Sequence, residues 1–258
     1  TGESLQQGLR RGLRERLGPI RSAVYLPEGT FPAALARRLP AAQAALLLRG
    51  ELLDASGAPC AARAQVIGAD IPEPRLNARG LESLGGREGA VRFEKPRAYS
   101  VEMPLGEAKE TRLVRRAAAF GDARAAGAGA IPPDFALQAA SVPPVNAWMP
   151  LAALAEAAGA PGGANLLVSS AEPGAFARAL AAALAPEDAG LVLEAGELRP
   201  AGGRPETVVK SRRVFLPPGL VAALEAKGLK AAPALFHLAD VFEAGTNASP
   251  YDFMTTLT

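Results

Sequence analysis

Two apolar runs joined by a short polar turn constrain the fold of this chain most strongly. Residues 45–53 read ALLLRGELL and residues 62–68 read ARAQVIG. Between them, Asp54 and Gly57 bracket a turn, in which the Asp side chain can bond the local backbone and Gly accepts a positive φ. Apolar runs on both sides of such a turn are typical of a β-hairpin. The sequence therefore predicts an antiparallel strand pair near the start of the chain.

Helical signals surround this hairpin. Leucines recur every four positions over residues 3–17, which predicts an amphipathic helix that Gly18-Pro19 ends. A second helix is predicted over residues 31–39, with Thr30 as its N-cap. After residue 146 the alternation of strands and helices returns. The segments predicted there are strands at 147–151 and 165–169 and helices at 152–158, 175–184 and 220–226.

Residues 70–145 have a different character. Helical periodicity is weak, Pro and Gly recur, and short strand-like pieces appear at 90–93, 99–103 and 111–120. We expect this range to form a separate, mainly β subdomain. It would be inserted between two α/β stretches at residues 1–69 and 146–258. Further strands are predicted at 191–194, 206–216, 234–243 and 251–257, and such sequential hairpins favour mixed or antiparallel pairing. The predicted fold class is α+β.

The composition excludes several classes of function. Of the 258 residues, 49% are hydrophobic, which suffices for a large core, and the net charge is only +2. The bias towards Ala and Arg is interpreted as that of a GC-rich bacterial codon pool. The densest basic run contains Arg10, Arg11, Arg14 and Arg16, interrupted by Glu15. Short mixed runs of this kind are usually a solvated helix face, although helical spacing could also turn them to an anionic surface. No nucleic-acid footprint is predicted.

The sequence contains few of the residue types that commonly serve in catalysis or bind metals. The chain has one histidine, His237, and one cysteine, Cys60. A lone histidine beside apolar residues is usually structural, and one His with one Cys does not make a zinc site. We therefore predict no catalytic residues, no bound cofactor and no metal. Trp148 is expected in the core, and the acidic pair Glu187-Asp188 is expected to be solvated.

The sequence is expected to be a piece of a longer protein. It begins at Thr1 without an initiator Met and ends in the run from Ser249 to Thr258. No window of about 18 apolar residues without charge occurs in it. If the parent protein crosses a membrane, its spans are expected outside this sequence.

Several segments together resemble the extracytoplasmic domain of ABC-transporter permeases of the MacB/FtsX/LolC type. The segments that carry the resemblance are residues 2–24 (GESL…RLGPIRSAV), 46–50 with 63–68 (LLLRG…RAQVIG), 142–151 with 164–168 (VPPVNAWMPL…ANLLV), and 211–216 with 249–251 (SRRVFL…SPY). The resemblance covers most of the chain. It departs from the family pattern at residues 85–135, which look shortened.

The resemblance implies a porter-like α/β subdomain with an inserted β subdomain, held outside the cell membrane, on the periplasmic side, between two transmembrane spans. It implies no catalytic residues here, because ATP would be hydrolysed by a separate cytoplasmic ATPase subunit. The implied partners are that subunit through the transmembrane part, a second permease copy, and an unknown extracytoplasmic substrate or protein. Both chain ends would then leave the domain on the side that faces the membrane.

Two other interpretations stay open. The chain could be a stand-alone extracytoplasmic domain that binds a small molecule or lipid, which a deep apolar pocket with convergent polar groups would favour. It could also be an enzyme of an unfamiliar type, which would require a cluster of perturbed ionisable groups in a cleft.

Overall fold

The computed structural model describes residues 2–27, 29–85, 88–96, 113–122, 129–198, 206–211, 222, 226, 234–244 and 247–257. The chain divides into two compact units, Thr1–Arg213 and Val214–Thr258. The fold is α+β, with helices beside a sheet that contains both parallel and antiparallel strands, as predicted. None of the helices in the described ranges is long and apolar enough to cross a bilayer.

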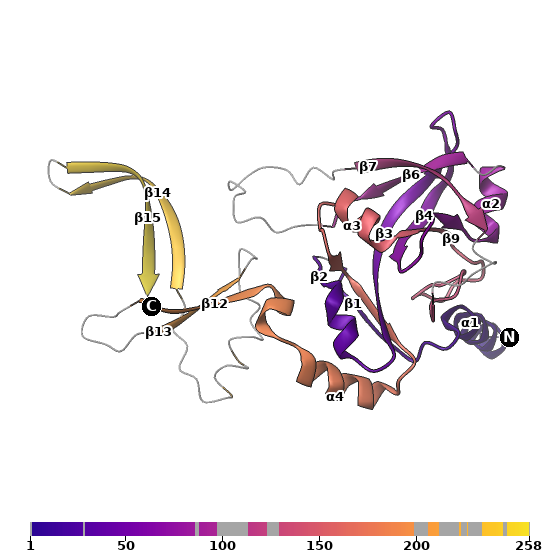
Figure 1. The fold of residues 1–258 in the computed structure, drawn as a ribbon, viewed down its shortest axis with the longest axis horizontal. Helices are drawn as coiled ribbons and strands as arrows, with labels where there is room; N and C mark the ends of the chain where they lie inside the picture. The colour runs from indigo at the N-terminus through magenta and orange to yellow at the C-terminus, as the bar shows by residue number, and fades with distance from the viewer. Residues whose placement is uncertain are drawn as a thin grey trace. The chain divides into compact units, whose positions relative to one another are not determined.

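A mixed sheet forms the centre of the first unit (Figure 1). Its strands run in the order β1-β11-β3-β4-β9-β5-β8, and β6 pairs with β3 and with β7. The bounds are β1 Ser22–Tyr25, β3 Ala42–Leu53, β4 Pro59–Ala69, β5 Arg75–Leu76, β6 Glu88–Glu94, β7 Leu113–Ala119, β8 Gly121–Asp122, β9 Val145–Pro150 and β11 Leu166–Ser169. The β4–β9 and β5–β8 pairs are parallel, and the others are antiparallel.

The predicted hairpin is the β3–β4 pair, and its turn is built as the sequence indicates. The Asp54 carboxylate accepts hydrogen bonds from the Ser56 hydroxyl at 2.6 Å and from the Ala58 N–H at 2.9 Å. The hydrogen bond from Ser56 is the main cause that lowers the pKa of Asp54 below its ordinary value. Gly57 has a φ of 89°, which residues with a side chain rarely adopt.

Both faces of the sheet are covered, which explains why the leucines of β3 are consecutive. Leu46 and Leu48 belong to one buried cluster, while Ala45 and Leu47 belong to a second. Successive side chains of a strand point to opposite faces, so a strand buried on both sides has no polar alternation. In β9, Ala147 lies in the first of these clusters and Trp148 in the second.

Helices and loops provide the cover. Helices α2 (Ala78–Leu84) and α3 (Leu151–Ala157) pack against the first cluster through Leu81, Leu84 and Leu154. Leu17, at the end of α1 (Gly2–Leu17), packs against the second cluster with Phe135. A third cluster joins the 3₁₀-helix η1 (Ala33–Arg38) and α4 (Pro173–Ala183) to Leu167 of β11.

The predicted helix over residues 31–39 is wrong in type and in its start. Phe31 and Pro32 form the short strand β2, which pairs with β10 (Gly163–Ala164), and only then does the six-residue 3₁₀-helix η1 begin. The backbone of Phe31 is engaged in strand pairing with Ala164, so Thr30 cannot serve as an N-cap. A tertiary contact thus overrides the local capping signal.

The predicted division at residues 69/70 and 145/146 does not coincide with the two compact units. Strand β6 pairs with β3, and β5 pairs with β9, so described segments from the range 70–145 belong to the same sheet as both flanking stretches. Val91 and Phe93 share a cluster with Leu46 and Ala147. In the described part of this range, strand residues outnumber those of the seven-residue helix α2.

Two further antiparallel pairs follow. Strand β12 (Leu191–Leu198) pairs with β13 (Glu206–Ser211), with a register shift between Ala195 and Leu198. In the second unit, β14 (Ala234–Ala244) pairs with β15 (Asn247–Leu257) from Ala234↔Leu257 onwards. The strand predicted at 99–103 and most of the helix predicted at 220–226 lie outside the described residues. The two chain ends belong to different units, so their common exit side stays a prediction.

Candidate functional site: the cleft between η1 and α3

Trp148 lies in the core, as predicted. Its side chain is buried in the cluster that also contains Phe135 and Ile67, and its indole N–H donates a hydrogen bond to the Pro133 carbonyl at 3.2 Å. A buried Trp that satisfies its N–H in this way is a packing element.

The single cysteine and the single histidine lie on different strands. Cys60 is half-buried on β4, where its Sγ contacts the Leu52 carbonyl at 3.3 Å and desolvation raises the pKa of the thiol. His237 lies on β14 in the second unit, opposite Met254 in the strand register. Across the residues that the structure describes, no group of three or more His, Cys, Asp or Glu side chains is placed to hold a metal ion.

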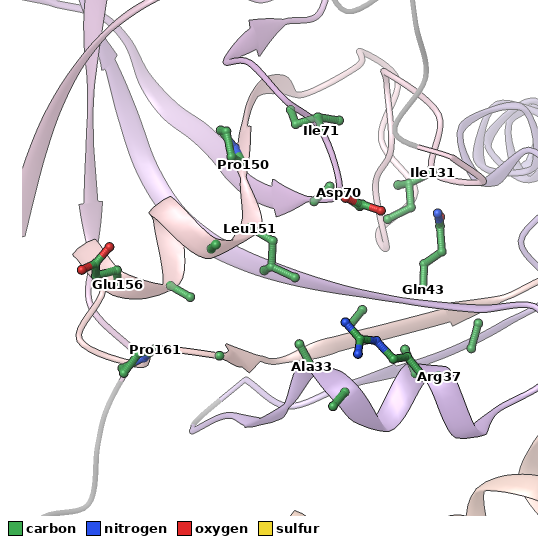
Figure 2. A pocket seen from close by; sticks show the side chains of 18 residues that line it. Ala33, Arg37, Gln43, Asp70, Ile71, Ile131, Pro150, Leu151, Glu156 and Pro161 are labelled. Carbon is green, nitrogen blue, oxygen red and sulfur yellow. The ribbon is translucent and has the colours of Figure 1, made fainter.

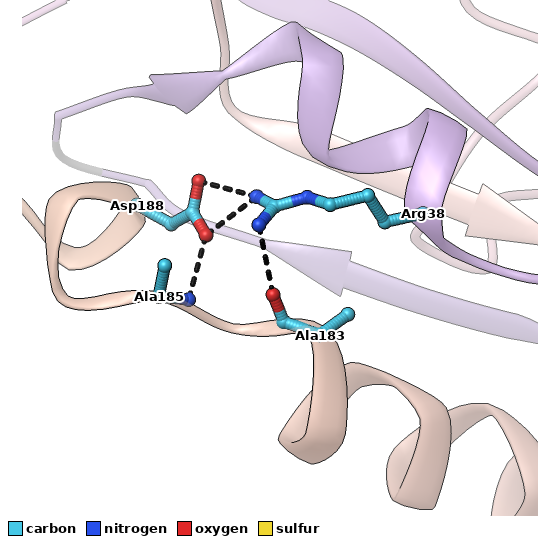
Figure 3. Close-up of polar contacts among 4 residues, drawn as sticks. All are labelled: Arg38, Ala183, Ala185 and Asp188. Carbon is cyan, nitrogen blue, oxygen red and sulfur yellow. Dashed lines mark hydrogen bonds and ion pairs between the residues drawn. The ribbon is translucent and has the colours of Figure 1, made fainter.

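The expectation that Glu187-Asp188 is solvated is wrong for Asp188. Its side chain is only 7% exposed, and the Nη2 of Arg38 lies 2.6 Å from each carboxylate oxygen (Figure 3). Burial by itself raises the pKa of Asp188, but the hydrogen bond from the Ala185 N–H and the Arg38 guanidinium together lower it below the ordinary value. A second nitrogen of Arg38 donates to the Ala183 carbonyl at 2.9 Å. Arg38 thereby fastens the end of η1 to the segment that follows α4.

A cleft of about 780 Å³ opens between η1 and α3 (Figure 2). We call it the η1–α3 cleft. Residues of η1 form one wall, and the end of β4 with the start of α3 forms the opposite wall. Its lining is Ala33, Ala34, Ala36, Arg37, Ala42, Gln43, Ala44, Ala69, Asp70, Ile71, Ile131, Pro150, Leu151, Ala152, Ala155, Glu156, Pro161 and Gly162. Eight of these residues are alanines, and their small side chains leave the space between the walls open.

Three charged residues line the cleft without a partner. Arg37, Asp70 and Glu156 are all exposed. Within the described residues, none of the three forms an ion pair or a side-chain hydrogen bond. Figure 2 shows Arg37 reaching from η1 along the cleft, Asp70 on the opposite wall and Glu156 near the end of α3. The neighbouring Arg38 differs in this respect, because its guanidinium donates to both the Ala183 carbonyl and the Asp188 carboxylate.

A network of buried asparagines shapes the segment that carries Ile131. Asn146 donates from its side-chain amide to the carbonyls of Pro133 and Phe135, both at 2.9 Å. Asn77 caps α2 by accepting from the Gly80 N–H at 3.0 Å, and it donates to Asp134 at 2.8 Å. Both asparagines are fully buried. The network ties a loop without regular structure to the sheet, so that the loop holds a fixed place beside the cleft.

None of the residues that line the cleft was predicted as a site residue from the sequence. The alanines of the cleft come from four separate segments, and the bias towards Ala was interpreted as a property of the codon pool. The buried asparagines were also missed, although Asn77 does precede a helix and could have been identified as an N-cap.

Comparison with known proteins does not assign the chain to a family. No protein-family model matches the sequence. No curated protein matches it significantly either.

Proposed function

We propose that this chain is the extracytoplasmic domain of an ABC-transporter permease, and that it couples the ATPase cycle to a substrate or partner protein outside the membrane. Its partners would be the ATPase subunit through a transmembrane part, a second permease copy, and an unidentified extracytoplasmic substrate or protein. It would act without nucleic acid and without catalysis of its own.

One observation carries this proposal. The segments that resemble MacB/FtsX/LolC-type permeases are separate in the sequence, but five of them contribute neighbouring strands of one sheet. Residues 2–24 include most of β1, residues 46–50 lie in β3 and residues 63–68 in β4. Residues 142–151 include β9, and residues 164–168 include most of β11. In the sheet these strands are consecutive, in the order β1-β11-β3-β4-β9. The two remaining segments lie outside this sheet, since Ser211 ends β13 and residues 249–251 belong to β15. Matches that gather on neighbouring strands support a shared architecture better than matches scattered over the fold would.

The distribution of shifted pKa values supports a role without catalysis. Among the described residues, the groups whose pKa departs from its ordinary value are Asp54 in the hairpin turn, Cys60 on β4 and Asp188 beside Arg38. Each has a structural explanation, and none lines the η1–α3 cleft. Catalytic groups are commonly clustered and perturbed within a cleft, which is a different pattern.

The runner-up function is a stand-alone extracytoplasmic domain that binds a small molecule or lipid. The observation that favours it is the η1–α3 cleft, because about 780 Å³ lies within the range of about 300–1,000 Å³ that ligand pockets occupy. The two functions differ in whether the protein is an integral part of a membrane assembly.

Membrane topology tests the proposal. A single cysteine is placed in the exposed hairpin turn by Ala55→Cys in a Cys60→Ser background of the full-length protein. Intact cells are then treated with a membrane-impermeant maleimide, and the Cys60→Ser parent provides the background signal. We expect labelling before cell lysis, membrane retention after alkaline carbonate extraction, and co-purification of an ATPase subunit in detergent. Labelling only after lysis would contradict the proposal, and release by carbonate would favour the stand-alone binding domain.

A further inference from the structure

We propose that the η1–α3 cleft binds short peptides that carry both a free α-ammonium and a free α-carboxylate. This inference concerns the ligand of the cleft. It holds or fails independently of whether the chain belongs to a transporter.

Charge on the two walls of the cleft argues for a zwitterionic ligand. Arg37 extends from the η1 wall, while Asp70 and Glu156 belong to the opposite wall (Figure 2). None of the three is neutralised by another described side chain. A guanidinium suits a carboxylate because its planar donors match the two oxygens, and a carboxylate in turn accepts from an ammonium. A molecule that lies across the cleft with one group of each sign would satisfy both walls.

The rest of the lining argues for a peptide of small residues. The cleft is too large for a single ion, and its volume corresponds to a ligand of several residues. None of the described residues that line it is aromatic, so this lining offers no surface on which a nucleobase or sugar ring would stack. Its alanine, proline and isoleucine side chains present apolar surface to small side chains. With two acids against one base, the lining disfavours an anion without an ammonium group.

The local structure holds Arg37 in position without engaging its charge. Arg38 is bound to Asp188 and to the Ala183 carbonyl, which fixes the end of η1 (Figure 3). Leu35 and Ala36 are buried in the third cluster and fix its inner face. On the floor of the cleft, the side-chain oxygen of Gln43 accepts from the Ala130 N–H at 2.9 Å. The walls are therefore formed before a ligand arrives, and the side chains that have to be ordered on binding are those of the exposed Arg37, Asp70 and Glu156.

Titration with three matched peptides tests the proposal on the full 258-residue chain. The ligands are tri-alanine, N-acetyl-tri-alanine, which lacks the ammonium, and tri-alanine amide, which lacks the carboxylate. Binding is followed by saturable shifts in ¹H–¹⁵N spectra of the labelled protein. We expect tri-alanine to bind with an affinity in the millimolar range, because the cleft opens to solvent. Each blocked peptide should bind about tenfold more weakly, as expected for the loss of one charge-assisted interaction.

Two variants assign each ligand group to one wall. In Arg37→Gln, tri-alanine should bind about tenfold more weakly, and the discrimination against the amide should disappear. In Asp70→Asn, the discrimination against the acetylated peptide should disappear instead. Glu156→Gln then measures how much the second acid contributes to binding the ammonium group. Ala34→Phe should prevent binding by filling the exposed side of the cleft.

Matched controls separate the cleft from general charge effects. Arg178→Gln on α4 and Glu82→Gln on α2 change exposed charges outside the cleft and should bind all three peptides as the unmodified protein does. Thermal unfolding without ligand should be the same for Arg37→Gln and Asp70→Asn as for the unmodified protein, because neither residue forms an ion pair or side-chain hydrogen bond within the described part of the chain. The proposal is overturned if tri-alanine produces no saturable shifts. It is also overturned if the cleft variants keep the full discrimination between the three peptides.

Discussion

Arg38 and Asp188 are 150 residues apart in the sequence, and the Nη2 of Arg38 lies 2.6 Å from both carboxylate oxygens of Asp188. Arg38 is the last residue of η1, and Asp188 lies in the 3₁₀-turn η3 (Pro186–Ala189). The Asp188 side chain is 7% exposed while that of Arg38 is 43% exposed, so the pair lies at the edge of the core. The pair couples the wall of the cleft to the segment after α4.

Replacing Asp188 by Asn should lower the free energy of unfolding by about 1 kcal/mol at pH 7, because a charge-assisted contact becomes a neutral one. The folded state lowers the pKa of Asp188 below its ordinary value of 3.8. Its contribution is therefore complete above that ordinary value and is lost as the pH falls through the lower folded-state value. Urea unfolding at pH 7, 5 and 3 should show the difference between the two proteins shrinking at the lowest pH.

The neighbouring Glu187→Gln is the control for this experiment, since Glu187 is exposed and forms no ion pair with a described residue. It should leave the stability unchanged at each pH. An equal loss in both variants would mean that local net charge, rather than the contact with Arg38, determines the effect.

Asn165 extends the β11–β3 strand pairing by its side chain. The side-chain oxygen accepts from the Leu47 N–H at 2.7 Å, and the side-chain nitrogen donates to the Leu47 carbonyl at 2.9 Å. Asn165→Leu keeps the number and branching of the side-chain heavy atoms but leaves the N–H and C=O of Leu47 without these two hydrogen bonds. We expect a loss of about 2–4 kcal/mol in unfolding free energy, measured by urea denaturation. Replacement of the exposed Gln138 by Ala should cost less than about 0.5 kcal/mol.

Gly50 permits the close approach of β3 to β6. A Cβ at this position would lie 2.5 Å from the Arg92 carbonyl oxygen and 2.9 Å from Cγ2 of Val66. Because β3 is paired on both sides there, the backbone has little freedom to move, and Gly50→Ala should destabilise the protein by about 1–3 kcal/mol. Gly8→Ala on α1 meets no atom within 4 Å and should stabilise by up to about 1 kcal/mol through helix propensity. Thermal unfolding temperatures that move in the same direction for both variants would contradict this explanation.

Asn77 acts as donor and acceptor at once, and two substitutions separate these roles. Asn77→Ala removes the cap of α2 and the contact with Asp134, and should cost about 2–4 kcal/mol. Asn77→Asp retains the acceptor for Gly80 but places a second carboxylate against Asp134. Like charges in a buried site favour sharing of a proton, so this variant should regain stability relative to the unmodified protein as the pH falls from 7 to 4. A pH-independent difference would show that repulsion from Asp134 is absent.

Local signals were sufficient for much of the secondary structure. The Asp54 turn, the helix ending at Leu17 and the strand from Leu166 to Ser169 were all predicted, and the structure confirms them. Each depends on residues within a few positions of one another, through turn chemistry or apolar periodicity. The prediction of a helix at 31–39 was wrong because Phe31 pairs with Ala164 in a short strand. Pairing with a strand distant in the sequence outweighs the local capping signal of Thr30.

The candidate site could not be predicted in this way. The Arg37, Asp70 and Glu156 side chains come from three different elements, and nothing in the spacing of these residues marks them as neighbours. Asp188 was expected in solvent because a Pro-led turn is usually exposed, while its partner Arg38 is encoded far upstream. A long-range ion pair has no local signature.

The sequence by itself determined the α+β class, the β3–β4 hairpin and the amphipathic α1. Turn chemistry and side-chain periodicity depend on residues that are only a few positions apart in the sequence. Only the tertiary structure decided that β6 pairs with β3 and that the Asn165 amide hydrogen-bonds the backbone of Leu47. It also decided that eight alanines from separate segments line one cleft. These features depend on which surfaces meet when both faces of the sheet are buried. Burial of apolar area is not directional, so the partner of each face is selected by the packing of the whole unit and not by any short stretch of the chain.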